Sequence, residues 1–314
     1  MSENIEQKVS IVVPAYNEED NIRETVESMA RMFRSSGLQG ELLLVNDGST
    51  DGTLAMARGL QQDHPELRII TYGRRRGLTR ALEAGFESAR GHIIVFYPAD
   101  LQFTAEDIPH MVAKVNEGFD IVTGWKQGNY EKGFVSAIYN FVTRWLFDIH
   151  VHDMNSVKAF RREILPCLDF RSDFHRYMVV MAVQAGFTAG EVKVRLFPRA
   201  SGKSKFGSPW RALAGVLDCL AMWFQYRFLT RPLLLFGSLG LASFLAGFMT
   251  GAVALYLRFV YDTGFRPLLT LSTLLLTLGA LFFAIGLLGE AVQAVNRRVQ
   301  KLEQRLQERE ARGP

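Results

Sequence analysis

The sequence has little cysteine, no signal-like N-terminal segment and no dense stripe of basic residues. Among its 314 residues, Cys167 and Cys219 are the only cysteines, and they lack the spacing of a metal site. This usage argues against a disulfide scaffold and fits a reducing compartment. The apolar run at 9–13 ends at Pro14 and is too short for a signal peptide, so we expect a cytoplasmic N-terminal part. A mild net charge of +4, with basic residues in short clusters, does not indicate nucleic-acid binding.

The first strand-like run is not followed by a Gly-x-Gly-x-x-Gly motif, so the ordinary dinucleotide-binding fingerprint is absent. Instead, apolar strand-like runs alternate with helix-like segments between residues 9 and 125. This alternation predicts an α/β fold with a doubly wound, mostly parallel sheet. We expect strands at 9–13, 42–45, 67–71, 93–97, 120–122 and 190–197, and helices at 19–33, from 51 onward, at 78–89, 105–116, 134–147 and 177–185.

Charged residues are absent from two long stretches of the last third, 232–257 and 267–289. Each stretch exceeds the roughly 20 residues that a helix needs to cross a bilayer. They predict a transmembrane hairpin within 231–293. Basic residues lie outside both ends of the hairpin, namely Arg227, Arg231, Arg297, Arg298 and Lys301. They predict that both ends are cytoplasmic.

Three further segments complete the predicted organisation. Residues 1–207 are expected to form a cytoplasmic domain. Residues 208–230 have apolar and aromatic side chains at helical spacing, which is typical of a helix in the membrane interface or of an ordinary core-facing helix. The charged tail, 294–314, has apolar residues at 4-3-4 spacing and is predicted to be helical. Either the tail or the hairpin could support a homo-oligomer.

An acidic turn follows the apolar run at 93–97, with Asp100 and Gln102 two residues apart. An acid just past the carboxyl end of a buried parallel strand points to the crevice where open α/β sheets bind ligands. Carboxylate and amide oxygens can share one hard metal ion, which can in turn bind a diphosphate. The alternative is a turn that caps the next helix.

Three motifs together resemble glycosyltransferase family 2. They are Val-Val-Pro-Ala-Tyr-Asn-Glu-Glu at 12–19, Val-Asn-Asp-Gly-Ser-Thr-Asp-Gly at 45–52 and Ala-Asp-Leu-Gln at 99–102. The segment Arg-Ala-Ser-Gly-Lys-Ser-Lys at 199–205 and the hairpin narrow the resemblance to the polyprenyl-phosphate glycosyltransferases, the group of dolichol-phosphate mannose synthase and bacterial undecaprenyl-phosphate glucosyltransferases.

The resemblance implies a GT-A fold, a nucleotide-sugar donor and a divalent cation, Mg²⁺ or Mn²⁺, held by Asp100 and Gln102. It also implies nucleotide-sugar contacts at Pro14, Tyr16, Asn17, Glu18, Asp47 and Asp100. From the residues alone there is an alternative interpretation, in which Asp47 and Gly48 form a tight turn and Asp51 caps a helix. A basic run at 74–76 either faces the donor diphosphate or forms a solvated turn.

The metal motif departs from the family, because Pro98 stands where the first Asp of an Asp-x-Asp-x-Gln pattern would be. Proline has no ligand atom, so water, a nearby side chain or a diphosphate oxygen has to replace the missing donor. This departure motivates an alternative, a catalytically impaired membrane scaffold of the same fold. A processive polysaccharide synthase is set aside, because the chain has two predicted spans and no Gln-x-x-Arg-Trp motif.

A lipid phosphate is already anionic near neutral pH, so as a nucleophile it needs cations rather than a general base. The resemblance assigns the acceptor phosphate to Lys126, Lys132, Ser136, Arg199, Ser204 and Lys205, with Asp100, Arg199 and Lys205 as the catalytic set. Each lysine could equally be a solvated surface charge. The segment at 153–158 resembles a family motif but is one residue short, so Asp153 either lines the donor sugar pocket or forms a cap or a loop salt bridge.

The predicted enzyme is therefore an inverting glycosyltransferase. It moves a sugar from a nucleotide-sugar, with a UDP-sugar favoured, to a polyprenyl phosphate. The reaction is expected on the cytoplasmic face of the bacterial inner membrane, as part of cell-envelope synthesis.

Overall fold

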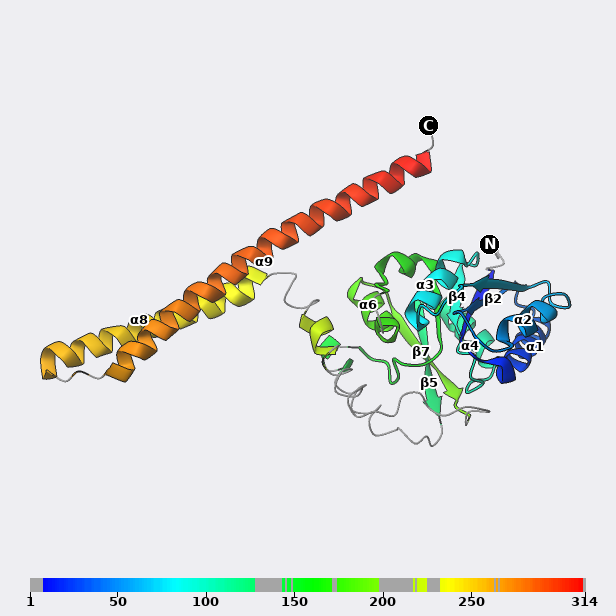
Figure 1. The fold of residues 1–314 in the computed structure, drawn as a ribbon, viewed down its shortest axis with the longest axis horizontal. Coiled ribbons are helices and arrows are strands. Elements are labelled where there is room, and N and C mark those ends of the chain that lie inside the picture. Colours follow the sequence, from blue (N-terminus) through cyan, green and yellow to red (C-terminus); the bar gives the residue numbers. More distant parts are fainter. Residues whose placement is uncertain are drawn as a thin grey trace. The chain divides into compact units, whose positions relative to one another are not determined.

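The computed structural model describes residues 8–127, 143–144, 146–147, 149–170, 174–197, 217, 219–224, 232–262, 264 and 266–312. The chain divides into two compact units, Met1–Gly215 and Val216–Pro314. The first is an α/β unit and the second is helical (Figure 1). The helix predicted at 134–147 and the interfacial helix predicted at 208–230 fall mostly outside the described residues, and the described parts of both are helical.

The α/β unit is built on a seven-stranded sheet of order β3-β2-β1-β4-β6-β5-β7. Both pairs that involve β6 are antiparallel and the others are parallel, which confirms the predicted mostly parallel, doubly wound sheet. The strands are β1 (Val9–Ala15), β2 (Gly40–Asn46), β3 (Leu67–Thr71), β4 (Ile93–Phe96), β5 (Ile121–Gln127), β6 (Lys158–Arg161) and β7 (Ala189–Arg195). The helices are α1 (Glu19–Ser36), α2 (Thr53–Leu60), α3 (Leu78–Ser88), α4 (Asp107–Asn116) and α6 (Met178–Gln184), with 3-10 turns η1 (Arg162–Cys167) and η2 (Phe174–Tyr177).

The core explains why the first four strands are readable from the sequence. Along β1, Val9, Ile11 and Val13 pack in one apolar cluster with residues of α1. On the other face, α3 approaches the sheet closely at Gly85, where a Cβ would lie 2.3 Å from a methyl group of Val12. Strands buried on both faces read as continuous apolar runs. The two layers of helices thereby fix the carboxyl ends of β1, β2 and β4 along one edge.

Strand β6 is not predicted by the sequence pattern, because it begins with a charged residue. Lys158 pairs with Phe96 of β4 on one side and with Thr123 of β5 on the other. Since β6 runs antiparallel to both neighbours, its start lies beside the carboxyl end of β4. The segment that precedes β6 is therefore brought next to the acidic turn.

The second unit contains two helices that are long and apolar enough to cross a membrane. They are α8 (Pro232–Tyr261) and α9 (Arg266–Arg312), and their apolar spans have mean hydropathies of 1.8 and 2.3. They form the predicted candidate membrane hairpin. Helix α9 continues without a break through the tail that the sequence analysis treats as a separate segment. The residues after Gly289 include many strong helix formers and no proline before Pro314, so nothing in the sequence ends the helix there.

Small residues line the contact between α8 and α9. A Cβ on Gly279 would lie 2.8 Å from the carbonyl oxygen of Gly240 and 2.9 Å from the backbone nitrogen of Phe244. Nearby, the Ser272 hydroxyl donates a hydrogen bond of 2.7 Å to the Gly247 carbonyl. Close backbone approach and interhelical hydrogen bonds are what hold helices together in lipid, where the hydrophobic effect does not.

Replacing Gly279 by leucine is expected to separate the two helices, because its side chain would overlap the backbone of α8. Overpacking of this kind costs about 1–3 kcal/mol. The measurement is unfolding of the detergent-solubilised protein on titration with a denaturing detergent. Ala280→Leu adds a similar side chain at the next, exposed position and is the matched control. Equal stability of the two variants would contradict the described packing.

Candidate functional site

The loops after β1 and β2 are joined by hydrogen bonds into one corner. The Asn17 carboxamide oxygen accepts from the backbone N–H of Thr50 at 2.9 Å, and the Asn17 N–H donates to the Ser49 hydroxyl at 3.0 Å. The Glu18 N–H donates to the Thr53 hydroxyl at 2.9 Å. Asn17 has a φ of 53°, a left-handed conformation that asparagine adopts more readily than most residues. Two of the predicted nucleotide contacts, Asn17 and Glu18, thus lie on a fixed scaffold.

Asp47 fastens a third loop, the one after β3, to this corner. Its carboxylate is 3% exposed, and its two oxygens accept from the backbone N–H groups of Arg76 at 2.7 Å and Gly77 at 2.8 Å. Gly48 has a φ of 65°, and a Cβ there would lie 2.4 Å from the carbonyl carbon of Arg74. The chain bends at Gly48. Asp47 therefore positions the 74–77 loop, whatever further contact its remaining lone pairs make.

The arginines of this loop stack on aromatic rings of the corner. The Arg75 guanidinium lies 4.2 Å from the ring centre of Tyr16, and that of Arg76 lies 4.5 Å from the ring centre of Tyr72. Such cation–π contacts fix long side chains while keeping their charge. A hollow of about 520 Å³ opens beside them, lined by Tyr72, Arg74, Arg75, Arg76, Arg80, Glu83, Ala84 and Glu87. The loop brings concentrated positive charge to the corner.

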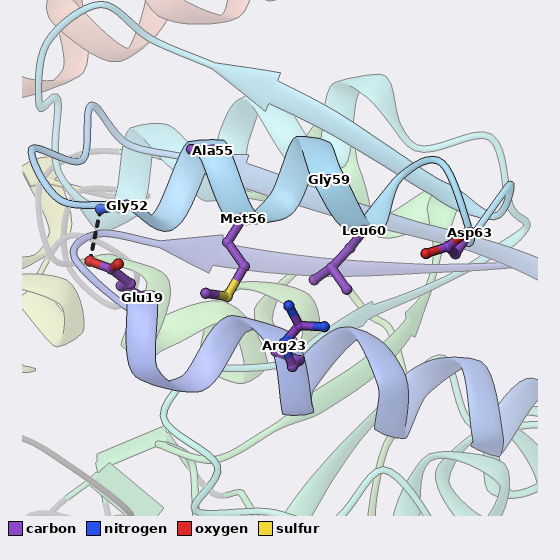
Figure 2. Close-up of a pocket in the computed structure, with 8 residues that line it drawn as sticks. All are labelled: Glu19, Arg23, Gly52, Ala55, Met56, Gly59, Leu60 and Asp63. Carbon is purple, nitrogen blue, oxygen red and sulfur yellow. Dashed lines mark hydrogen bonds between the residues drawn. The ribbon is translucent and has the colours of Figure 1, made fainter.

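A second hollow, of about 400 Å³, lies between α1 and α2 (Figure 2). At its end the Glu19 carboxylate accepts a hydrogen bond of 2.9 Å from the Gly52 N–H, which adds to the joint between the first two loops. Asp51 accepts from the N–H and hydroxyl of Thr53 at the start of α2. Burial raises the pKa of Asp51, but these hydrogen bonds outweigh burial, and the pKa lies below its ordinary value. None of the predicted site residues lines this hollow.

The acidic turn after β4 is held at both ends. The Gln102 N–H donates to the Asp100 carboxylate at 3.3 Å, across Leu101 with a φ of 55°. The Gln102 carbonyl accepts from the Phe197 N–H, beyond β7, at 2.8 Å. The buried Tyr97 hydroxyl donates to the Phe103 carbonyl, and burial raises the pKa of Tyr97. Asp100 and Gln102 are thereby kept together at the edge of the sheet.

The donor atoms of this turn fit a hard cation. Oxygen ligands from a carboxylate and an amide suit Mg²⁺ or Mn²⁺, and Mg²⁺ commonly keeps several waters and few protein ligands. Within the described residues, no three His, Cys, Asp or Glu side chains gather into a metal-binding group. Asp100 and Gln102 are the two side chains of this turn that would hold such a cation.

The fold brings Lys126 next to Asp153. Lys126 is predicted to bind the acceptor phosphate, and Asp153 is predicted to line the donor sugar pocket or to form a cap or a loop salt bridge. The Lys126 ammonium lies 3.1 Å from an Asp153 carboxylate oxygen and donates to the Asn155 carbonyl at 2.6 Å. The other oxygen of the buried Asp153 accepts from the Asn155 N–H at 2.9 Å. Of the alternatives for Asp153, the loop salt bridge is present. Lys126 is consequently a paired, largely buried cation rather than a solvated surface charge.

Lys158 belongs to the same cluster, and the sequence analysis assigns it no role. It is 1% exposed and its ammonium donates to the Ser156 carbonyl at 2.9 Å. Burial lowers the pKa of Lys158 to about 7, the Asp153 carboxylate opposes this lowering and the Lys126 ammonium adds to it. The sequence signal for Lys158 is its position as a single charged residue between Val157 and the apolar pair Ala159-Phe160.

The remaining predicted residues divide into two groups. Pro14 lies in β1 and Tyr16 directly follows it, next to the corner. Those predicted for the acceptor phosphate beyond Lys126 lie outside the described residues, namely Lys132, Ser136, Arg199, Ser204 and Lys205.

Comparison with known proteins identifies relatives of this arrangement. Residues 10–168 match the family described as Glycosyl transferase family 2. Dodecaprenyl-phosphate galacturonate synthase of Rhizobium johnstonii is 33% identical over 282 residues, which cover 85% of this chain and 82% of the relative.

Solved structures share the fold at lower identity. Glucosyl-3-phosphoglycerate synthase from Mycobacterium tuberculosis with Mn²⁺, UDP-glucose and phosphoglyceric acid has a TM-score of 0.56 and 21% identity, over 68% of this chain and 80% of that one. The same enzyme with Mg²⁺ and UDP has a TM-score of 0.55 and 21% identity over the same shares. The match to the family and the identity to the Rhizobium enzyme show that this chain is a glycosyltransferase and belongs to glycosyl transferase family 2.

Proposed function

We propose that this enzyme transfers a sugar from a nucleotide-sugar, with a UDP-sugar favoured, to a polyprenyl phosphate, with inversion at the anomeric carbon. The observation that carries the proposal is the position of the acidic turn. It follows β4, and β4 is a neighbour of β1, whose loop is hydrogen-bonded to the loop after β2. The Tyr97 N–H donates to the Val12 carbonyl at 3.0 Å, so the turn begins beside the end of β1. The name of the Rhizobium relative, a dodecaprenyl-phosphate sugar synthase, supports the same acceptor class.

The donor would bind along this edge. The corner of Tyr16, Asn17 and Glu18 holds the nucleotide, and the arginine loop fastened by Asp47 adds positive charge near the diphosphate. Asp100 and Gln102 would hold a divalent cation at the acidic turn. When bound, that cation neutralises the charge on the departing nucleoside diphosphate.

The acceptor would approach from the opposite side of the sugar. A phosphate oxygen of the lipid forms the new bond to C1 while the bond from C1 to the nucleotide phosphate breaks, which inverts the anomeric configuration. The phosphate needs no general base because it is already ionised. We assign Arg199 and Lys205, with Lys132, Ser136 and Ser204, to hold it. The Phe197 N–H donates to the Gln102 carbonyl, and Arg199 follows Phe197 by two residues in the sequence.

The lipid acceptor agrees with the two apolar helices. Basic residues flank their outer ends more heavily than the short connection between them. By the positive-inside rule, we propose that both termini and the catalytic domain are cytoplasmic in a bacterial inner membrane. The product would be a polyprenyl-phosphate sugar for the cell envelope.

The test uses membranes that contain the overproduced enzyme, supplied with polyprenyl phosphate and a panel of radiolabelled UDP-sugars and GDP-mannose. The expected result is label in the lipid extract that requires added enzyme, is lost with EDTA and returns with Mg²⁺ or Mn²⁺. Membranes lacking the enzyme are the control. If no donor of the panel labels the lipid, the impaired-scaffold alternative replaces the proposal.

A further inference from the structure

The α/β unit contains a buried cluster with more positive than negative charge. Lys126 and Lys158 contribute two ammonium groups, and both lie close to the single carboxylate of Asp153. In the described part of the chain, Asp153 is the acidic group that acts on Lys158. Burial of charge is costly unless the charge is paired. The cluster is therefore short of one anionic group whenever Lys158 is protonated, and an anion bound beside Lys126 would favour that protonated form.

Lys126 is the member of the cluster that a ligand can reach. Its side chain is 14% exposed, whereas Asp153 and Lys158 are closed off from solvent. Its contacts with Asp153 and the Asn155 carbonyl engage two of the three N–H groups of its ammonium. The lysine is held in place by protein partners and can still donate to an incoming anion.

The cluster lies beside the acidic turn. Lys158 is the register partner of Phe96, the last residue of β4, and its ammonium lies 5.7 Å from the Phe96 ring centre. Asp100 and Gln102 follow Phe96 closely in the sequence and hold the donor diphosphate under the proposed function. The donor sugar is attached to that diphosphate. The sugar, rather than the nucleotide, would therefore lie next to Lys126.

We infer that the donor sugar is a hexuronate, and that Lys126 binds its carboxylate. The inference rests on the proposed function, since it specifies the sugar class of the same donor. A neutral hexose carries a hydroxymethyl group at this position and supplies no anion to the cluster. The galacturonate in the name of the Rhizobium relative agrees with this chemistry. The competing interpretation assigns Lys126 to the acceptor phosphate, as the sequence analysis does.

The test compares UDP-galacturonate with UDP-galactose, which differ only in the carboxylate at C6. The full-length enzyme is assayed in detergent with polyprenyl phosphate, and kcat/KM is measured for each donor. The wild-type enzyme is expected to favour the uronate by about 100-fold, because a site built for a charged group discriminates strongly against an analogue that lacks it. Lys126→Met should lower that preference to less than about tenfold, and Lys126→Arg should retain most of it.

Two further variants separate binding from folding. Lys126→Met leaves Asp153 without its ion pair, so Lys126→Met combined with Asp153→Asn removes both charges, and its donor preference should fall to the same level. Lys193→Met is the matched control, because Lys193 is an exposed residue whose ammonium lies 5.3 Å from the ring centre of Trp125 and is not part of the cluster. Its donor preference should equal that of the wild type.

The outcomes are distinguishable. If Lys126→Met lowers kcat/KM equally for both donors and raises KM for polyprenyl phosphate, Lys126 serves the acceptor and the inference is overturned. A wild-type enzyme that prefers UDP-galactose also overturns the inference, while leaving the proposed function intact. Failure to transfer from any donor, uronate or neutral, overturns the proposed function itself.

Discussion

Asp100→Ala is expected to lower the rate of sugar transfer about a thousandfold, the largest loss for any single substitution at this site. With Pro98 in the position of the family's first acid, Asp100 is the one carboxylate of the metal motif. The backbone hydrogen bond from Phe197 to the Gln102 carbonyl does not involve the Asp100 side chain and still holds the turn in the variant, so the loss would come from the missing ligand rather than from unfolding. The measurement is initial rate at saturating lipid, over a range of Mn²⁺ concentrations.

A second measurement tests whether the loss of rate on Asp100→Ala comes from weaker binding of the cation. Binding of Mn²⁺ in the presence of UDP, followed by electron paramagnetic resonance, should weaken in parallel with the rate. Asp63→Ala replaces an acid that lines the hollow between α1 and α2, and should leave both quantities unchanged. A loss smaller than about tenfold on Asp100→Ala would show that the cation is held elsewhere.

Asp47→Ala is expected to destabilise the α/β unit and to raise KM for the donor about 100-fold. The substitution leaves the N–H groups of Arg76 and Gly77 without their acceptor, and each such loss costs about 1–3 kcal/mol. The freed loop no longer holds the arginines against Tyr16 and Tyr72. The measurements are denaturant unfolding without nucleotide and the kinetics of transfer.

Asp47→Asn supplies the graded control, because its amide nitrogen cannot accept a hydrogen bond and only one of the two contacts survives. Its stability should fall between those of the wild type and Asp47→Ala. Stability that stays at the wild-type value in both variants, with only the donor KM changed, would show that Asp47 acts solely as a contact to the nucleotide-sugar. The loop-fastening role would then be wrong.

The sequence predicts most of the sheet because the strands buried between two helical layers are uninterrupted apolar runs. Strand β6 is missed for the opposite reason, since Lys158 places a charge in a buried position. Helix α9 continues through the charged tail, because loss of hydrophobicity after Gly289 marks the end of an apolar span and not the end of a helix.

Within the site, the residue types are predictable and their partners are not. The motifs identify Asp47 and Asp100 by their place after β2 and β4. The partners of Asp47 are backbone groups 29 and 30 residues away, which carry no side-chain signal. The pair of Lys126 with Asp153 likewise depends on how the segment before β6 returns to β5. Such contacts are set by topology.

The most direct test of the account is mass spectrometry of the lipid after incubation of the purified enzyme with polyprenyl phosphate and the donor panel. The account predicts a lipid whose mass has increased by one sugar residue, with one nucleoside diphosphate released for each molecule formed. Without the lipid, no such release should occur. A folded enzyme that leaves the mass of the lipid unchanged with every donor would contradict it.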